Sequence, residues 1–259
     1  MPPAVNLIFI HGISSQTTGY SNLLFDLILK EINILLKNKY PAETTKNKLS
    51  CLKQYEILWA DITTDLVNRY LQLQFELEGR NGFWWRFLSE VDSLILQILY
   101  YVQDKGQKDL GKLEILKRVD EQFQNIENIE NSINVIISHS LGTVIIFDYI
   151  FGFKKVKLDK SFPVEFLFTL GSPLSLFISS MGYVDSRLTL PSNVKNWINI
   201  LDPQDPIARL DEPHFKNIPV DDVRIKTTRL AFFLRAHTYY WKSRKLAKFL
   251  AQKIAPKIK

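Results

Sequence analysis

The sequence predicts an α/β fold in which a mostly parallel central sheet is flanked by helices. Short apolar runs alternate along the chain with longer segments of helical periodicity, which is the pattern of parallel strands joined by crossover helices. Hydrophobic residues make up 46% of the chain and charged residues 23%, a balance typical of globular proteins with a large core. A length of 259 residues suits one such domain, so we expect residues 1–259 to fold as a single unit.

The predicted strands are short runs rich in β-branched and aromatic residues. The first of them is apolar on both faces, as a buried parallel strand requires. The third leads into a small turn and then into an apolar run that suits a helix. The six predicted strands lie at Val5–Ile10, at Tyr55–Ala60, from Val135 onward, at Val164–Leu170, at Asn196–Leu201 and near Asp221.

Helices are predicted between and after these strands. Apolar residues at helical spacing from Tyr20 to Leu35 indicate the first helix, and a basic helix is predicted after His237. The segment 61–132 contains no clear strand, and we expect it to be a helical insertion within the domain that forms a lid or cap. Its aromatic residues either line an acyl pocket or only pack between helices and sheet. Three helices are predicted in it, at about Asp61–Leu77, Phe83–Val102 and Leu110–Ile126.

The charge of the chain is concentrated at its C-terminal end. The net charge is +6, and every charged residue from Trp241 to Lys259 is Lys or Arg. Such a helix presents either a solvated face or a surface that attracts anionic membrane lipids. The first residues lack the basic and small-residue features of a signal peptide, and no run reaches the roughly 18 apolar residues of a spanning helix. We therefore expect a cytoplasmic protein, free of membranes or peripheral to one.

The run VIISHSLGTVIIF carries the strongest chemical signal in the sequence. It predicts a strand, a sharp turn with Ser140 at its apex, and a helix. This is the outline of the nucleophile elbow G-x-S-x-G, whose small residues let the strand and the helix pass close together. Gly142 supplies the second small residue, but Ser138 occupies the position of the first glycine. The pattern S-x-S-x-G is weak by itself, so its context along the chain decides its interpretation.

A serine nucleophile needs a base and an acid that orients the base, and both are expected after it in the chain. Two histidines follow Ser140: His214 is interpreted as an exposed loop residue, whereas His237 lies at the start of the closing helix. The loop DPQDP after the strand Asn196–Leu201 holds Asp202 and Asp205, at the sheet edge where α/β active sites collect. We favour Asp205 as the acid, and Asp202 remains either an alternative acid or a cap of the turn.

The pieces FIHGI, SHSLGT, TLGSPL, DPQDPI and AHTYYW, spread over the whole chain, resemble the α/β-hydrolase superfamily, in particular its lipase and serine-esterase branch. The resemblance implies the α/β-hydrolase fold and cleavage of carboxylic esters, lipid-like or with other acyl groups, through an acyl-enzyme. It implies that Ser140 is the nucleophile, Asp205 the acid and His237 the base. It also implies an oxyanion hole made by the backbone N–H groups of Ile13 and Leu141.

Two neighbouring features have simpler interpretations. Gly171-Ser172-Pro173 is interpreted as a turn at a strand end that packs beside the elbow, and not as a second nucleophile. His139, next to the nucleophile, is expected to pack beside the elbow because an adjacent side chain points the wrong way to act as its base.

The sequence contains no motif for a metal site, a nucleotide cofactor or nucleic-acid binding. There is no H-E-x-x-H pattern or phosphate-binding glycine loop, and the single cysteine, Cys51, excludes a multi-cysteine metal site, so we expect no cofactor. No nucleic-acid-binding module is recognisable either. Two alternatives remain open. The protein is a catalytically weakened hydrolase fold that acts as a binding or membrane-associated scaffold, as Ser138 and the basic terminal helix would suggest, or it transfers acyl groups with the same residues.

Overall fold

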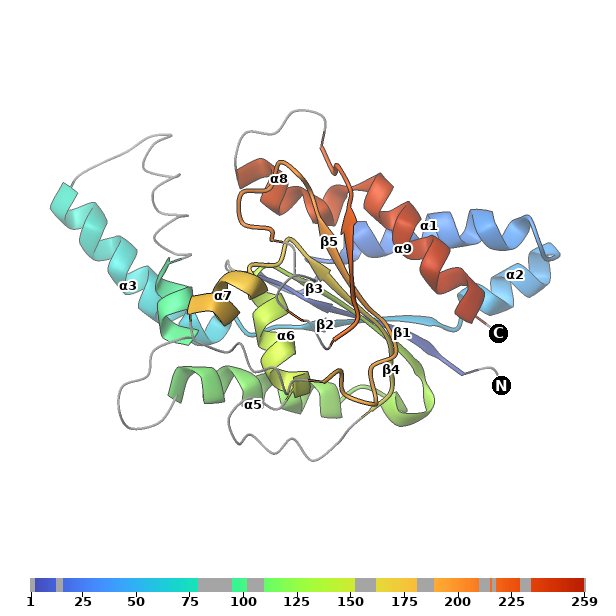
Figure 1. Ribbon diagram of the computed structural model, residues 1–259, viewed down its shortest axis with the longest axis horizontal. Helices are drawn as coiled ribbons and strands as arrows, with labels where there is room; N and C mark the ends of the chain where they lie inside the picture. The colour runs from blue at the N-terminus through green and yellow to red at the C-terminus, as the bar shows by residue number, and fades with distance from the viewer. Residues whose placement is uncertain are drawn as a thin grey trace.

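The central sheet has six strands that all run parallel (Figure 1). The computed structural model describes residues 3–12, 16–78, 95–101, 110–151, 162–180, 189–209, 215, 218–228 and 234–258. The strands are β1 (Val5–Ile10), β2 (Leu52–Ile57), β3 (Ile133–His139), β4 (Val164–Leu170), β5 (Trp197–Leu201) and β6 (Val220–Arg224). Their order is β2-β1-β3-β4-β5-β6. The chain therefore reverses its direction of travel across the sheet between β1 and β3, the place where α/β proteins form their sites.

Five of the predicted strands lie where the sequence places them, and β2 is displaced. It covers Leu52–Ile57, not Tyr55–Ala60. The strand ends at Ile57 because the next backbone N–H groups donate to side chains and not to β1. Leu58 N donates to Gln122 Oε1 at 2.9 Å, and Trp59 N donates to His11 Nε2 at 3.4 Å. β2 is also an edge strand with partly exposed polar residues, so its first half lacks the apolar run by which the inner strands are recognised.

Helices cover both faces of the sheet. The α1 helix (Asn22–Lys37) and the α9 helix (Arg244–Ile254) lie on one face, and the α5 helix (Leu110–Gln124) and the α6 helix (Leu141–Phe151) lie on the other (Figure 1). The shorter α2 (Ala42–Leu49), α7 (Leu174–Ser180) and α8 (Leu234–Thr238), the α3 helix (Asp61–Glu78) and the 3₁₀ turns Ile129–Asn131, Tyr239–Lys242 and Ala255–Lys257 complete the described elements.

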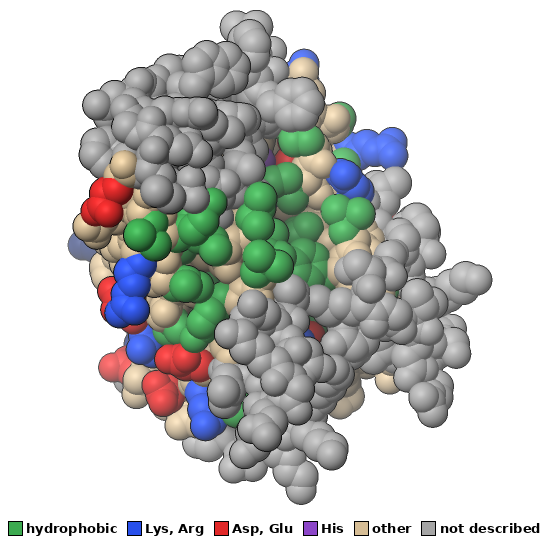
Figure 2. Space-filling model, turned by 90° about the vertical axis from the view of Figure 1, so that its left-hand side faces the viewer, with side chains coloured by type: hydrophobic (Ala, Val, Ile, Leu, Met, Phe, Trp, Pro, Cys, Tyr) green, Lys and Arg blue, Asp and Glu red, His purple; other side chains and the backbone are tan. Residues whose placement is uncertain are grey.

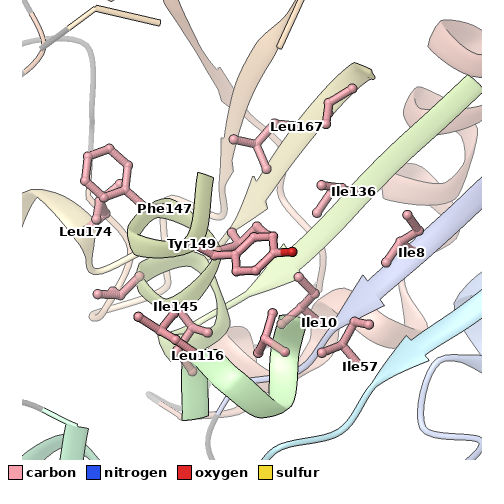
Figure 3. Packing of buried hydrophobic residues seen from close by; sticks show 14 of the residues in the cluster. Ile8, Ile10, Ile57, Leu116, Ile136, Ile145, Phe147, Tyr149, Leu167 and Leu174 are labelled. Carbon is pink, nitrogen blue, oxygen red and sulfur yellow. The ribbon is translucent and has the colours of Figure 1, made fainter. Parts of the chain in front are cut away.

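The core is divided by the sheet into two layers, as the alternation of side chains along a strand requires. Leu7 and Phe9 of β1 pack towards α1 and α9, whereas Ile8 and Ile10 pack towards α5 and α6. Figure 3 shows the second layer, in which Ile145 of α6 and the isoleucines of the strands belong to one buried cluster. Because both faces of β1 are fully buried, its strand end is held rigidly, and with it the loop that begins at His11.

The segment 61–132 is helical wherever it is described, apart from a 3₁₀ turn and connecting residues before β3. Its helix α3 and its helix α5 confirm two of the three predicted helices, and residues 95–101 of the middle one are helical. The remainder of the middle helix lies outside the described residues. Ile115 and Val119 of α5 are buried in the core, so α5 acts as a crossover helix of the sheet. The lid or cap remains a prediction.

The basic C-terminal segment consists of a 3₁₀ turn, the α9 helix and a second 3₁₀ turn. The chain passes from α8 through the 3₁₀ turn to Ser243, whose hydroxyl accepts a hydrogen bond from Leu246 N and caps α9. Leu246, Leu250 and Ile254 of α9 are buried against α1, which leaves the lysines on the outward face. Within the described residues, no helix is both long and apolar enough to cross a bilayer.

Candidate active site

Ser140 stands at a strained turn between β3 and α6. Its φ angle is 54°, in the left-handed region that non-glycine residues rarely occupy. Ser140 N donates to Leu170 O at 3.0 Å, and Thr143 N donates to Ser140 O at 2.9 Å, so the turn is fixed on both sides. A sharp strand–turn–helix of this kind lifts the serine side chain out of the sheet. With the sheet order and direction, this elbow makes the architecture an α/β-hydrolase fold.

The substitution of serine for the first elbow glycine is accommodated by the neighbouring strand. Ser138 is fully buried, and its hydroxyl donates to Phe168 O on β4 at 3.1 Å. The second elbow glycine has no such freedom, because a Cβ on Gly142 would lie 2.4 Å from the carbonyl oxygen of His11. The end of β1 and the start of α6 therefore meet at Gly142, while the position of Ser138 has room for a hydroxymethyl group.

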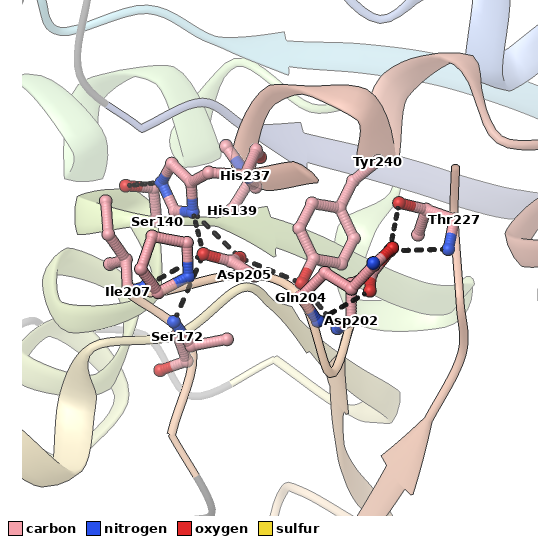
Figure 4. A network of polar contacts seen from close by, with 12 residues as sticks. His139, Ser140, Ser172, Asp202, Gln204, Asp205, Ile207, Thr227, His237 and Tyr240 are labelled. Carbon is pink, nitrogen blue, oxygen red and sulfur yellow. Dashed lines mark hydrogen bonds and ion pairs between the residues drawn. The ribbon is translucent and has the colours of Figure 1, made fainter. Parts of the chain in front are cut away.

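The structure brings Ser140, His237 and Asp205 together in one hydrogen-bonded chain (Figure 4). Ser140 Oγ lies 2.8 Å from His237 Nε2. On the other side of the ring, His237 Nδ1 lies 2.9 Å from Asp205 Oδ2 and 3.1 Å from Asp205 Oδ1. An ionised carboxylate can only accept, so Nδ1 carries the imidazole proton and Nε2 is left to accept the proton of the serine.

Asp205 is buried but held in its charged form. Its Oδ1 accepts hydrogen bonds from Ile207 N at 2.9 Å and Ala208 N at 3.3 Å, and its Oδ2 accepts one from Tyr240 Oη at 2.9 Å. Burial raises the pKa of Asp205, but the bond to His237, the charge of that ring, the Ile207 N–H and the Tyr240 hydroxyl together outweigh it. The net result is a pKa below the ordinary value, so the acid remains ionised beside the histidine.

Asp202, the alternative acid, bonds to a different part of the chain. Its Oδ2 accepts from Thr227 N at 2.6 Å and from Thr227 Oγ1 at 2.7 Å, and its Oδ1 accepts from Gln204 N at 2.9 Å. These contacts fix the turn after β5 to the segment that follows β6. The carboxylate of Asp202 is thereby directed at Thr227, and that of Asp205 at His237 (Figure 4).

His139 holds the backbone of the histidine that faces the serine. Its Nε2 lies 2.7 Å from the carbonyl oxygen of His237, and the two rings pack with centroids 4.7 Å apart. Burial, together with the charge of His237, lowers the pKa of His139 to about 3. His139 is therefore neutral near pH 7, and its single ring proton sits on Nε2 because a carbonyl can only accept.

His11 plays a comparable part at the end of β1. Its Nδ1 lies 2.6 Å from Gly12 O, and its ring stacks on Trp59 with centroids 5.2 Å apart. Trp59 Nε1 also donates to His11 O at 3.0 Å. Burial lowers the pKa of His11 to about 4, so this histidine too is neutral near pH 7. These contacts fix Gly12 against the elbow, where a Cβ would lie 2.4 Å from Ser140 Cβ.

One half of the predicted oxyanion hole is described. Leu141 is the first residue of α6, and N–H groups in a first helical turn have no acceptor within the helix. Such groups, aided by the helix dipole, suit a developing negative charge beside Ser140. The other predicted donor, Ile13, lies outside the described residues, and so does His214.

Two residues of the site, and one residue that holds the chain before α1, were not identified from the sequence. Gly171 has a φ of 55°, and a Cβ there would lie 2.9 Å from Asp205 Oδ2 and 3.3 Å from His237 Nδ1. Glu56 binds Gly19 N, Ser21 N and the Ser21 hydroxyl, and so anchors the chain between β1 and α1.

Tyr240 donates a hydrogen bond to the Asp205 carboxylate. Of the three, only Tyr240 could have been inferred from the sequence. It stands three places after His237 in a predicted helix, and residues at that spacing lie on the same helix face.

The turn after β4 lies beside the elbow as predicted. Ser172 Oγ lies 2.8 Å from Thr143 Oγ1, which in turn donates to Ser140 O at 2.7 Å. Ser172 Oγ also accepts from Leu174 N at 3.1 Å, the first residue of α7. Its hydroxyl is thus used within the turn, and α7 starts from the residues that support the nucleophile.

An apolar face flanks the site. Figure 2 shows hydrophobic side chains gathered at the centre of the side of the molecule that carries α3 and α7. Both helices begin a few residues after a strand ends: α3 starts at Asp61 after β2, and α7 starts at Leu174 after β4. Among the described residues, five of the nine exposed large hydrophobic side chains belong to α3, residues 95–101 and α7, namely Leu66, Leu73, Ile95, Leu99 and Leu176. Five of these nine side chains therefore lie on three helical segments of the chain.

No cluster of His, Cys, Asp and Glu side chains suited to a metal ion occurs in the described part of the chain. The chemistry that this site can perform with its described groups is proton transfer between Ser140 and His237, supported by the Asp205 charge.

Comparison with known proteins gives distant likenesses. No protein-family profile matches the chain. A protein of Schizosaccharomyces pombe described as a probable mitochondrial phospholipase is 29% identical over 151 residues, which cover 48% of this chain and 20% of that protein. The match thus spans about one fifth of that relative.

Two solved structures resemble the fold at low sequence identity. A dienelactone hydrolase from Anabaena variabilis has a TM-score of 0.48 and 11% identity, over 97% of this chain and 86% of that one. A cutinase-like protein from a Cryptococcus species has a TM-score of 0.45 and 13% identity, over 99% of this chain and 96% of that one.

Proposed function

We propose that the protein is a serine hydrolase that cleaves carboxylic esters with lipid-like or other acyl groups. The observation that carries the proposal is the continuous chain from Ser140 Oγ through His237 to Asp205, with contacts of 2.8 and 2.9 Å. A serine hydroxyl becomes nucleophilic when an oriented base removes its proton. The strained φ of Ser140 supports the same role, because strain at the strand-to-helix turn that carries the serine is typical of nucleophile elbows.

The reaction proceeds in two steps. Ser140 Oγ attacks the ester carbonyl carbon while His237 Nε2 takes its proton, and Asp205 stabilises the imidazolium that forms. His237 then gives the proton to the leaving alkoxide, which departs as the alcohol and leaves an acyl-enzyme. In the second step His237 removes a proton from water, and the hydroxide attacks the acyl carbon. The acid product leaves, and the proton returns to Ser140.

The oxyanion of each tetrahedral intermediate requires fixed donors. The N–H of Leu141, at the start of α6, is proposed as one of them. The N–H of Ile13 is proposed as the second, because the contact between Gly12 and Ser140 Cβ brings the loop after β1 to the nucleophile. His11 and Trp59 hold this loop through backbone contacts and stacking.

An acyl substrate is supported by the surface around the site. The exposed apolar side chains of α3, residues 95–101 and α7 offer contact area to a hydrocarbon chain (Figure 2). The description of the yeast relative as a phospholipase agrees with such a substrate, although the match covers 20% of that protein.

Peripheral contact with an anionic membrane is proposed as a second property. The outward residues of α9 include Arg244, Lys245, Lys248 and Lys253, all of them exposed. Basic residues near an anionic surface contribute about 1 kcal/mol each, and salt screens them. Vesicles with phosphatidylserine should bind the protein, and raised salt or the triple change of Lys245, Lys248 and Lys253 to Gln should weaken that binding. Binding that neither salt nor the triple variant affects would contradict the contact.

Ester turnover tests the catalytic proposal. The wild type should hydrolyse p-nitrophenyl esters, with a preference among short and long chains that reports the acyl pocket. Ser140→Ala should lose activity by about 10³-fold or more. Ser132→Ala is the matched control, because Ser132 is a buried serine next to the opposite end of β3, bonded to Asn128 O at 2.8 Å. A wild type without turnover that still binds vesicles would instead support the scaffold.

A further inference from the structure

Tyr240 joins the acid loop to the segment that carries the histidine. Its side chain is fully buried. Its hydroxyl lies 2.9 Å from Asp205 Oδ2, and it accepts a hydrogen bond from the backbone N–H of Asp202 at 2.8 Å (Figure 4). The hydroxyl therefore sits between the start of the DPQDP turn and the carboxylate that faces His237.

The direction of the hydrogen bond to Asp205 is fixed by its neighbours. A tyrosine hydroxyl has one proton to donate. The N–H of Asp202 occupies an acceptor position of Tyr240 Oη, so the proton of that hydroxyl points at Asp205 Oδ2. Burial raises the pKa of Tyr240, and the nearby charge of Asp205 raises it further, which keeps the hydroxyl protonated. Tyr240 is thus a permanent donor to the carboxylate.

The ring of Tyr240 is held as firmly as its hydroxyl. It packs on His139 with ring centroids 5.4 Å apart, and its Cε2 atom would lie 2.9 Å from a Cβ placed on Gly171. Tyr240 follows His237 by three residues in the helical segment that begins with α8. One helical face therefore carries both the base and the donor that orients the acid of that base.

We infer that Tyr240 is a positioning residue of the proposed hydrolase, which fixes the Asp205 carboxylate and sets the basicity of His237. The inference rests on the proposed function for its effect on turnover. Asp205 Oδ2 is shared between His237 Nδ1 and Tyr240 Oη. A donor on the carboxylate spreads its negative charge, so less of that charge stabilises the imidazolium. Tyr240 therefore keeps His237 a weaker base than an Asp205 freed of this bond would make it.

The described groups that face His237 are few. Asp205 and Ser140 bond its ring, and His139 packs against it from β3. His139 is neutral near pH 7, because its pKa is lowered to about 3. Asp205 is thus the charged group that bonds the ring of His237, so a change at that ring reports chiefly on Asp205 and on whatever bonds Asp205.

The test is Tyr240→Phe, which removes the hydroxyl and keeps the ring. We expect kcat to fall roughly tenfold, because the Asp205 carboxylate loses a bond that fixes it. KM should stay unchanged, because Tyr240 is buried and does not line the surface. We expect NMR with labelled histidine to show that His237 of the variant holds its second proton to higher pH than His237 of the wild type. Tyr149→Phe is the matched control: Tyr149 is a buried tyrosine whose hydroxyl donates to Asp120 Oδ1 at 2.9 Å, and its loss should move neither quantity.

A second measurement covers the case in which Tyr240→Phe does not fold. Incorporation of 3-fluorotyrosine makes the phenol a stronger donor without removing the bond, so the pKa of His237 should move downward. The same incorporation into Tyr149→Phe should give the same downward shift, because that variant keeps Tyr240.

The possible outcomes separate the two proposals. A kcat that falls while the titration of His237 stays unchanged would reduce Tyr240 to a packing residue and overturn the inference. The inference is equally overturned if Tyr240→Phe matches the wild type in both readouts. A wild type without turnover removes the proposed function alone, because the NMR titration still measures the effect of Tyr240 on His237.

Discussion

The hydroxyl of Ser138 donates to the carbonyl oxygen of Phe168 across the β3–β4 pair, at 3.1 Å. The side chain that replaces the usual elbow glycine is thus bonded within the sheet, on the strand that leads to Ser140. A buried hydroxyl without a partner would cost about 1–3 kcal/mol, but this one has its acceptor. The departure from the common elbow therefore has a local structural explanation.

Restoring glycine at this position should leave the reaction unchanged. We expect Ser138→Gly to keep kcat and KM close to those of the wild type, because the hydroxyl faces Phe168 and not the nucleophile. Its free energy of unfolding should fall by about 1 kcal/mol from the lost hydrogen bond and the added chain entropy. Ester kinetics and denaturant unfolding measure both effects, and a kcat raised tenfold would show that serine slows the enzyme.

Gly171 should be far more sensitive. An alanine Cβ there would lie 2.9 Å from Asp205 Oδ2 and 3.3 Å from His237 Nδ1, so the acid and the base would have to move. Small displacements of reacting groups cost on the order of 10²-fold, and we expect kcat of Gly171→Ala to fall by at least that factor.

Gly19→Ala provides the control for backbone strain. Gly19 also has a positive φ, of 94°, but its Cβ would meet the side chain of Asn22 on α1. That variant should lose about 1–2 kcal/mol of stability and keep its kcat. Equal losses of kcat in Gly19→Ala and Gly171→Ala would mean that strain, and not contact with the acid–base pair, controls activity.

The two aspartates of the DPQDP turn should respond differently to conversion into amides. Asp205→Asn places a carboxamide beside His237 Nδ1 and favours the wrong tautomer, so kcat should fall roughly 10³- to 10⁴-fold. Asp202→Asn weakens the bonds to Thr227 N and Oγ1, so its free energy of unfolding should fall by about 1–3 kcal/mol while most of its kcat remains. The reverse pattern would make Asp202 the acid.

His139 should make the stability of the protein depend on pH. Its pKa is lowered to about 3 in the folded state, against an ordinary value of 6.5. Between these values the unfolded chain binds more protons than the folded one, so stability is present above about pH 6.5 and is lost as pH falls towards 3. The slope from this residue is at most about 1.4 kcal/mol per pH unit.

Glutamine at position 139 separates this titration from the contact itself. Its amide can still donate to the carbonyl of His237, but it takes up no proton. Denaturant unfolding between pH 7 and pH 4.5 should show a smaller loss of stability for His139→Gln than for the wild type. Some loss should remain, since the pKa of the buried His11 is lowered to about 4. Identical slopes in the two proteins would exclude His139 as a source of acid sensitivity.

The inner strands could be predicted from the sequence because parallel strands buried on both faces are apolar throughout. Val5–Ile10 and Val164–Leu170 match β1 and β4 in both bounds. The edge strand β2 was misplaced, because its exposed side lets polar residues stand where the inner strands have apolar ones. The helix α2 was missed because its sequence, AETTKNKL, has no apolar stripe to mark it.

For the site, too, local sequence patterns could be predicted, whereas contacts between residues far apart in the chain could not. The turn at Ser140 is a local pattern, and the order of the acid and base after it follows from the resemblance. The bonds of Tyr240 to Asp205 and of His139 to the carbonyl of His237 join residues 35 and 98 positions apart. Such pairings depend on where strand ends and helices meet in space, which neither periodicity nor spacing along the chain specifies.

Covalent labelling of Ser140 tests whether its hydroxyl is an activated nucleophile. A fluorophosphonate reacts only with a serine whose hydroxyl is activated, and peptide mass mapping identifies the modified residue. One equivalent of label is expected on the peptide that contains Ser140. Labelling should disappear in Ser140→Ala and fall sharply in His237→Ala. A wild type that folds and takes up no label, or that carries the label on another serine, would contradict the role of Ser140 as the nucleophile.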